Sequence, residues 1–112
     1  MKKKLIDILE TLKVPVFQQG SLNENEQYPD SFFTFWNFEN SDGQFYDDKN
    51  HASIWGFWVF VYSNDPERVE SLEKDAKKLL KNDGFIFSGS EDADSGRETH
   101  TGRMMTFYIL EV

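Results

Sequence analysis

Cysteine is absent from this sequence, so the chain has no disulfide framework, no thiolate nucleophile and no cysteine-based metal site. Histidine occurs only twice, as His51 and His100, and both lie in polar stretches rather than in an apolar pattern. We therefore expect both to be solvated loop residues and not metal ligands. The lack of cysteine also favours a cytosolic, unprocessed origin.

Long apolar runs are also missing. No uncharged apolar segment reaches the roughly 20 residues that a membrane helix needs. The start MetLysLysLys, followed by apolar residues, is similar to a signal peptide, but Asp7 and Glu10 interrupt that run and no small-residue cleavage site follows. We expect a soluble protein that does not bind membranes.

Catalytic motifs are lacking as well. The sequence has no glycine-rich phosphate loop and no serine nucleophile elbow. Asp47 and Asp48 are adjacent, so in an extended chain they face opposite ways and cannot easily share a proton. The acidic segment 91–98 superficially resembles a calcium loop but lacks its spacing of glycine and glutamate. The sequence predicts no enzyme, no cofactor and no bound metal.

What the sequence does contain is acidic and aromatic. The 112 residues carry a net charge of −8, which argues against tight binding to nucleic acid through its phosphates. Such a surface would suit DNA that passes by without adhering. Aromatic residues make up 16% of the chain, which indicates either an aromatic-rich core or an interface. The length predicts one domain, residues 1–112.

The segment Ala52–Ser63 dominates the chain. Its twelve residues include no charge and no proline, and they are rich in aromatic and β-branched side chains, which predicts a strand. Alternate residues of a strand point to opposite faces, and here both faces are apolar. We therefore expect a central strand that is covered above and below.

Four further strands are predicted around it. Residues 14–17 form a short edge strand that tolerates Pro15. Residues 31–40 form a long strand, apolar on both sides for half its length, which a turn at 41–43 ends. A strand begins at 85–88, and residues 103–112 form the last one. The polar stretches 18–30, 44–51 and 89–102 are expected to be loops or connections.

Two amphipathic helices complete the pattern. Leu5, Ile8, Leu9 and Leu12 form the apolar stripe of a helix over 2–13. A second helix starts at Asn64 or Asp65 as N-cap, with Pro66 in its first turn, and ends at Gly84. The order α-β-β-β-α-β-β predicts an α+β fold with one antiparallel or mixed sheet of four to five strands and both helices on one face.

Two helices cover only one face of such a sheet. The other face would expose several aromatic side chains. Their exposure loses several kcal/mol of burial free energy and favours association with another surface. We predict that this face is a subunit interface formed by Phe33, Phe35, Trp55 and Phe57, or by the residues on the opposite side of the same strands. In the alternative interpretation, the sheet curls and the long loops fold over its open face.

The arrangement of elements resembles a known family. The residues that carry the resemblance are ValProValPhe at 14–17, TyrProAsp at 28–30 before PhePheThrPheTrp at 32–36, the strand at 55–63, AsnAspProGluArg at 64–68, AsnAspGlyPhe at 82–85, the acidic segment at 88–94 and the final strand from Arg103. Across nearly the whole chain this pattern is similar to the tail-completion, or tail-terminator, proteins of long-tailed bacteriophages and prophages.

The resemblance implies a structural protein of the virion. Such a protein would cap the head-proximal end of the tail tube and mediate head-tail joining as a ring, typically a hexamer, after assembly in the bacterial host cytoplasm. It implies as partners other copies of the chain, the tail tube protein and the head connector, with DNA only as passing cargo. Two loops would contact the tube or the connector; their candidate residues are Glu24, Glu26, Tyr28, Glu91, Asp92 and Asp94.

A different function remains open on the sequence. A monomeric α+β binding module could hold a small ligand or peptide on its aromatic sheet face. That interpretation predicts a stable monomer with a pocket lined by Trp36, Trp55 or Trp58, whereas the virion protein is expected to form oligomers.

Overall fold

The fold is known from a computed structural model, which describes residues 1–18, 29–43, 52–96 and 99–111. The predicted α+β fold and its order of elements, α-β-β-β-α-β-β, are confirmed. The elements are α1 (Lys2–Glu10), β1 (Val16–Gln18), β2 (Ser31–Gly43), β3 (Ala52–Ser63), α2 (Pro66–Asn82), β4 (Ile86–Ala93) and β5 (Thr101–Glu111).

The five strands form one mixed sheet in the order β1-β2-β3-β5-β4. The short β1 pairs in parallel with β2, and the other neighbours are antiparallel. The strand β3 lies in the middle, as its two apolar faces predict. It pairs along its length with β2 on one side and with β5 on the other.

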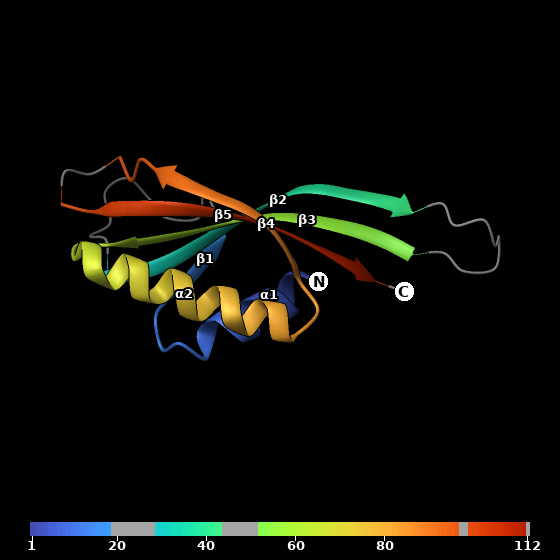
Figure 1. Cartoon of the computed structure of the whole chain (residues 1–112), viewed down its shortest axis with the longest axis horizontal. Helices are drawn as coiled ribbons and strands as arrows, with labels where there is room; N and C mark the ends of the chain where they lie inside the picture. The colour runs from blue at the N-terminus through green and yellow to red at the C-terminus, as the bar shows by residue number, and fades with distance from the viewer. Residues whose placement is uncertain (19–28, 44–51, 97–98, 112) are drawn as a thin grey trace.

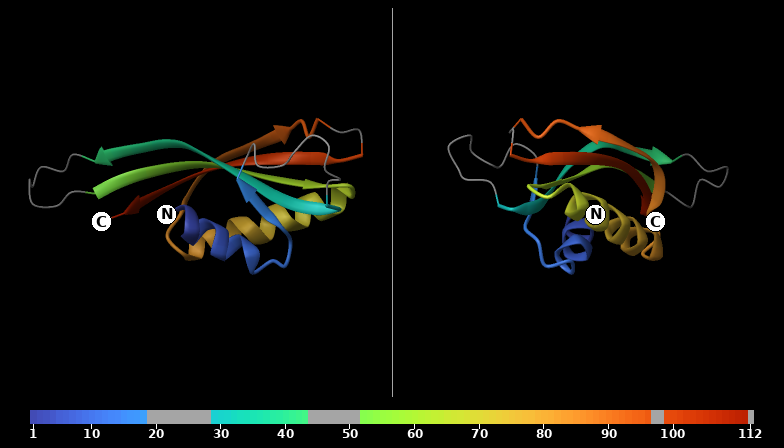
Figure 2. Two further views of the ribbon diagram at one scale, coloured as in Figure 1. Left: turned by 180° about the vertical axis from the view of Figure 1, so that it is seen from behind. Right: turned by 60° about the vertical axis from the view of Figure 1, so that its left-hand side comes forward.

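Both helices lie on the same face of this sheet, as predicted (Figures 1 and 2). The core fills the space between the helix layer and the sheet. From the helices it takes Leu5, Leu9, Val69, Leu72, Ala76 and Leu80, and from the sheet Phe33, Phe35, Phe57, Val59, Val61, Met105, Phe107 and Ile109. Neither helix in the described part of the chain is long and apolar enough to cross a membrane.

The second helix begins and ends where the sequence predicts. Asp65 is the N-cap, and its side chain accepts a hydrogen bond from the backbone N–H of Glu67. Pro66 occupies the first turn, where its missing N–H costs nothing. Gly84 follows the helix with a φ of 94°, a left-handed conformation that glycine adopts without strain.

Several boundaries differ from the sequence prediction, among them that of β1, which spans Val16–Gln18 instead of residues 14–17. The first helix ends at Glu10 rather than at Lys13. The strand β2 continues to Gly43, because residues 41–43 pair with β3 instead of forming the predicted turn. Residues 89–93 belong to β4, and residues 101–102 to β5, instead of a loop. These residues are polar, but backbone pairing at the sheet edge does not require apolar side chains.

The sheet is longer than the helix layer. In Figure 1, β2, β3 and the end of β5 reach past the helices on the side where both strands of the β2–β3 hairpin meet the undescribed segment 44–51. At this end the sheet has no helix beneath it. The molecule is accordingly elongated, with an open upper face and an extended arm.

Candidate functional site

The two faces of the sheet have different surroundings. Along β3, the side chains of Phe57, Val59 and Val61 point toward the helices and are fully buried. Their neighbours Ile54, Trp58 and Phe60 point to the opposite side and are only partly buried. We call this second side, which no helix covers, the open face.

The four residues named first for the predicted subunit interface lie on the face that the helices cover, which leaves the alternative on the opposite side of the same strands as the prediction. Phe33 and Phe57 are completely buried and Phe35 is 1% exposed, all within the core beneath the helices. Trp55 lies on the same side, packs against that core and stacks on Phe57 with ring centroids 6.1 Å apart. The sequence could not distinguish the two faces because both are apolar, and only the packing of the helices decides between them.

The open face carries an apolar surface contributed by four strands. Its residues are Trp36 and Phe38 from β2, Ile54, Trp58 and Phe60 from β3, Met104, Tyr108 and Leu110 from β5, and Ile86 from β4. Three of them are strongly exposed for large apolar side chains: Trp36 by 44%, Leu110 by 47% and Ile86 by 59%. Large apolar side chains that are exposed on one face of a sheet are typical of a contact surface.

A β-bulge shapes the centre of the open face. The register of β2 against β3 shifts between Asn37 and Glu39, so Glu39 pairs with Gly56 and lies on the open face beside Phe38. The Asn37 side chain stabilises the bulge, because its Nδ2 donates to the carbonyl oxygens of Glu39 at 2.8 Å and of Gly56 at 2.9 Å. The bulge therefore brings onto the open face a carboxylate, Glu39, that strict alternation would direct toward the helices.

The ring of Phe38 lies over Gly56. It stacks on Trp58 with centroids 4.8 Å apart and an interplanar angle of 22°, and it meets Tyr108 edge-on at 5.7 Å. These contacts bring together aromatic side chains from three neighbouring strands. The result is an ordered aromatic platform on the open face.

The other end of the open face is covered by loop residues. Phe32 and Tyr62 are buried there, with ring centroids 5.2 Å apart. The ring of His100 lies 6.0 Å from that of Phe32, and its Nε2 is 2.8 Å from the carbonyl oxygen of Pro29. At this end, the described residues around His100 therefore agree with the alternative in which loops fold over the sheet.

His100 is not the solvated loop residue that the sequence predicts. A carbonyl oxygen can only accept, so the Nε2–H of His100 donates to Pro29. In the neutral ring Nδ1 then accepts from the hydroxyl of Thr99, at 2.8 Å. His100 thus ties the β4–β5 connection to the start of β2. His51, Asp47 and Asp48 lie outside the described residues.

The acidic candidates for partner contacts have different positions. Glu91 and Asp92 belong to β4, and Glu91 is exposed on the open face opposite Met104. Asp94 lies just beyond β4 and accepts a hydrogen bond from the backbone N–H of Gly96 at 2.8 Å. The remaining candidates, Glu24, Glu26 and Tyr28, lie outside the described residues.

Arg103 connects β5, β4 and α2. Its Nη1 donates to Asp92 at 2.8 Å and its Nε donates to Glu73 at 3.0 Å, while its Nη2 donates to Ser90. The pKa of Arg103 is raised, chiefly by the hydrogen bond with Asp92 and then by that with Glu73. These bonds fix the edge strand to the helix layer, which is a structural role rather than a catalytic one.

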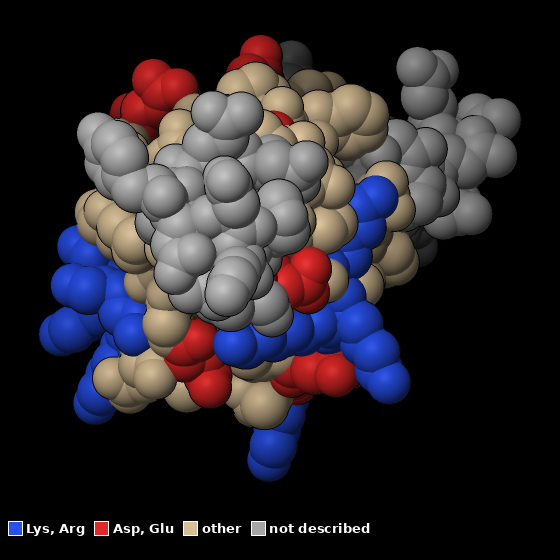
Figure 3. Space-filling view, turned by 90° about the vertical axis from the view of Figure 1, so that its right-hand side faces the viewer, with Lys and Arg blue, Asp and Glu red and all other residues tan. Residues whose placement is uncertain are grey.

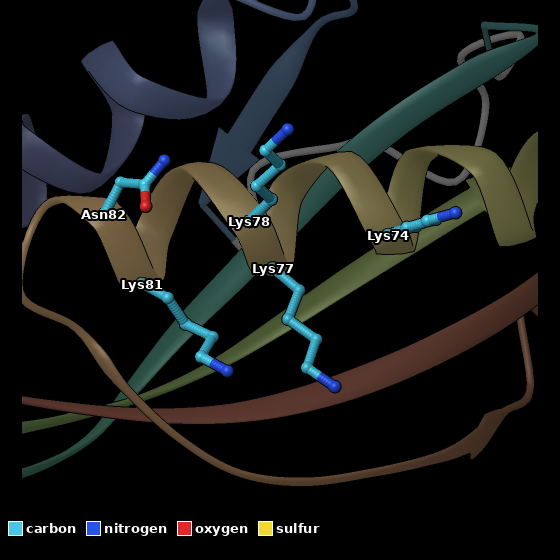
Figure 4. Close-up of a pocket in the computed structure, with 5 residues that line it drawn as sticks. All are labelled: Lys74, Lys77, Lys78, Lys81 and Asn82. Carbon is cyan, nitrogen blue, oxygen red and sulfur yellow. The ribbon is translucent and has the colours of Figure 1, made fainter.

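Basic side chains gather on the helix side of the molecule. Nine of the twelve Lys and Arg residues lie within positions 1–13 and 65–83, against eight of the twenty acidic ones. Figure 3 shows the lysine and arginine side chains mainly around the helix layer, in the lower half of the view. On α2, an open hollow of about 400 Å³ is lined by Lys74, Lys77, Lys78, Lys81 and Asn82 (Figure 4).

Among the described residues, no group of three His, Cys, Asp or Glu side chains is placed to hold a metal ion. The features that distinguish the molecule are the open face, with its aromatic platform, and the basic helix layer on the opposite side. Sequence reasoning missed the bulge, although a glycine inside a strand, here Gly56, is a signal for one.

Comparisons with known proteins give a likeness of fold. No protein-family model and no curated protein matches the sequence. A chain in the structure of the virion of a native gene transfer agent particle is similar over 92% of this chain and 83% of its own length, with a TM-score of 0.58 and 10% identity. The bacteriophage SPP1 gp17 protein is similar over 99% of this chain and 87% of its own length, with a TM-score of 0.47 and 10% identity.

Proposed function

We propose that this chain is a structural protein of a phage or phage-like virion, which caps the head-proximal end of the tail tube and mediates head-tail joining as a ring. The observation that carries the proposal is the likeness of fold to a virion chain over 92% of the sequence. The resemblance of the sequence pattern to tail-completion proteins agrees with it. The proposal includes no catalytic activity and no cofactor.

The open face supports assembly. A side chain such as Trp36 or Leu110, close to half exposed, gains free energy when a neighbour covers it, at about 25 cal/mol per Å² of apolar surface. We therefore assign the subunit contact to the open face, with Trp36, Phe38, Trp58, Phe60 and Leu110 as its centre. This replaces the assignment to Phe33, Phe35 and Phe57, which the helices already cover.

The proposed partners are further copies of the chain, a tail tube protein and a head connector. With a net charge of −8, the surface suits a ring through which DNA passes without adhering. Glu91, Asp92 and Asp94, at the end of the β4–β5 hairpin, remain candidates for contact with tube or connector. Glu24, Glu26 and Tyr28 remain candidates on the sequence alone. The location would be the virion, after assembly in the host cytoplasm.

The experiment that tests the proposal is light scattering behind a sizing column over a range of protein concentrations. A discrete species near six times the chain mass of 13.2 kDa is the expected result. Negative-stain images of that species should then contain rings. A monomer at every concentration would contradict a ring that forms from the free chain, and it would favour a monomeric binding module that holds a ligand on its aromatic face.

A further inference from the structure

The open face and the helix layer differ in charge. Among the described strand residues that point to the open face, two are acidic, Glu39 and Glu91, and none is basic. In a symmetric contact the same patch meets itself, so the two open faces would bring Glu39 and Glu91 of both copies together without any cation. Such like-charge juxtaposition is unfavourable at an interface. The charge pattern therefore favours a partner surface that is basic.

The chain itself supplies a basic surface on α2. Lys74, Lys78 and Lys81 are exposed, and none of them forms an ion pair with another described residue. With Lys77 they make up what we call the lysine ridge, which borders the hollow of about 400 Å³ (Figure 4). The helix α2, which carries the ridge, lies on the side of the sheet opposite the open face (Figures 1 and 2).

Lysine packing on aromatic rings already occurs within the chain. The Nζ of Lys77 lies 4.1 Å from the ring centroid of Phe87, and that of Lys4 lies 5.9 Å from the ring of Phe85. A lysine stem can cover apolar surface while its ammonium group reaches a carboxylate or the face of an aromatic ring. The open face offers both: aromatic rings in the platform, and carboxylates in Glu39 and Glu91.

We propose that neighbouring copies meet through a heterologous contact, in which the lysine ridge of one copy docks on the open face of the next. The exposed Trp36 would lie against the ridge, and the free ammonium groups would pair with Glu39 and Glu91. Glu91 would then belong to the subunit contact, which leaves Asp92 and Asp94 for the tube or connector. Because the two surfaces lie on opposite sides of one chain, each copy can bind two neighbours. Such contacts generate a ring when the rotation between copies closes. The inference thus deepens the proposed function and rests on its ring.

A charge exchange tests this contact. The ridge variant carries Lys78→Glu with Lys81→Glu, and the face variant carries Glu39→Lys with Glu91→Lys. Each variant alone should need a protein concentration at least about 100-fold higher to assemble, because like charges meet. An equimolar mixture should regain the wild-type assembly size, since every contact between unlike variants again pairs opposite charges. A control variant, Lys2→Glu with Lys3→Glu on α1, has the same change of charge and should assemble normally.

The outcomes separate this contact from the ring itself. If wild type forms a ring and the ridge variant assembles equally well, the lysine contact is overturned while the ring stands. The same holds if both variants fail to assemble and their mixture does not recover, although their circular dichroism is native. A wild-type chain that stays monomeric overturns the ring and the contact together. Recovery that disappears when salt is raised well above about 0.1 M would support the ionic part of the contact.

Discussion

Phe38 occupies the space directly above Gly56, on the neighbouring strand. A Cβ atom on Gly56 would lie 2.7 Å from Cζ and 2.9 Å from Cε2 of the Phe38 ring. Real Cβ atoms do not approach so closely, so any other residue at position 56 would displace the ring. The absence of one side chain thus allows three aromatic rings from different strands to meet on the open face.

We expect Gly56→Ala to disturb this platform without unfolding the chain. The displaced Phe38 ring would lose its stacking on Trp58, so unfolding free energy should fall by about 1–3 kcal/mol. Urea unfolding monitored by tryptophan fluorescence measures the loss. In a Phe38→Ala background the same glycine substitution should cost much less, because the clash is gone. Equal costs in both backgrounds would contradict the contact.

The two faces of the sheet should respond differently to substitution. Phe57→Ala removes a fully buried ring and should lower unfolding free energy by about 3–5 kcal/mol. Trp36→Glu changes a side chain that is 44% exposed, so far-UV circular dichroism should stay native while assembly is lost. Light scattering and thermal unfolding of both variants check this. Normal assembly of the Trp36 variant would exclude that residue from the subunit contact.

The start of α2 depends on one carboxylate. Asp65→Ala removes the acceptor for the Glu67 backbone N–H and should cost about 1 kcal/mol of unfolding free energy. Asp75→Ala, at an exposed position inside the same helix, is the matched control and should change stability by less than about 0.5 kcal/mol. Denaturant unfolding compares them, and equal effects would mean that the cap contributes nothing.

Arg103 should stabilise the β4 edge modestly. Arg103→Gln removes the ion pairs with Glu73, which is 23% exposed, and with Asp92, which is 91% exposed, so we expect a loss of at most about 1 kcal/mol that shrinks in high salt. Because the folded chain raises the pKa of Arg103, its contribution is complete below the usual pKa of arginine and disappears only as the pH rises through the higher folded value. Arg103 stays protonated from neutral to moderately alkaline pH. Over that range, the difference in unfolding free energy between wild type and Arg103→Gln should therefore not decrease through deprotonation of Arg103.

The hydrogen bond between His100 and Pro29 should stabilise the start of β2 in particular. His100→Ala removes the hydrogen bond to Pro29 and uncovers part of Phe32. We expect a loss of about 1–2 kcal/mol and faster amide exchange at the start of β2, with little change at the far end of the hairpin. Uniform acceleration of exchange throughout the sheet would instead indicate global destabilisation.

Local patterns in the sequence were sufficient for the elements and their order. Periodicity separated helices from strands, and Asp65, Pro66 and Gly84 marked the ends of α2, because caps act within a few residues of the backbone they satisfy. The two apolar sides of Ala52–Ser63 likewise placed β3 in the middle of the sheet. The sequence did not predict that residues 89–93 belong to a strand. They lack an apolar pattern of their own, and they are extended because their backbone pairs with β5.

The assignment of the faces came from the tertiary structure alone. Phe57 and Trp58 are neighbours of similar character, yet one is buried beneath the helices and the other belongs to the open face. Alternation in a strand says that the two side chains point apart, but it does not say which side the helices take. That choice depends on how both helices pack against all strands at once, and with it the predicted interface moved from Phe33, Phe35 and Phe57 to the aromatic residues on the other side.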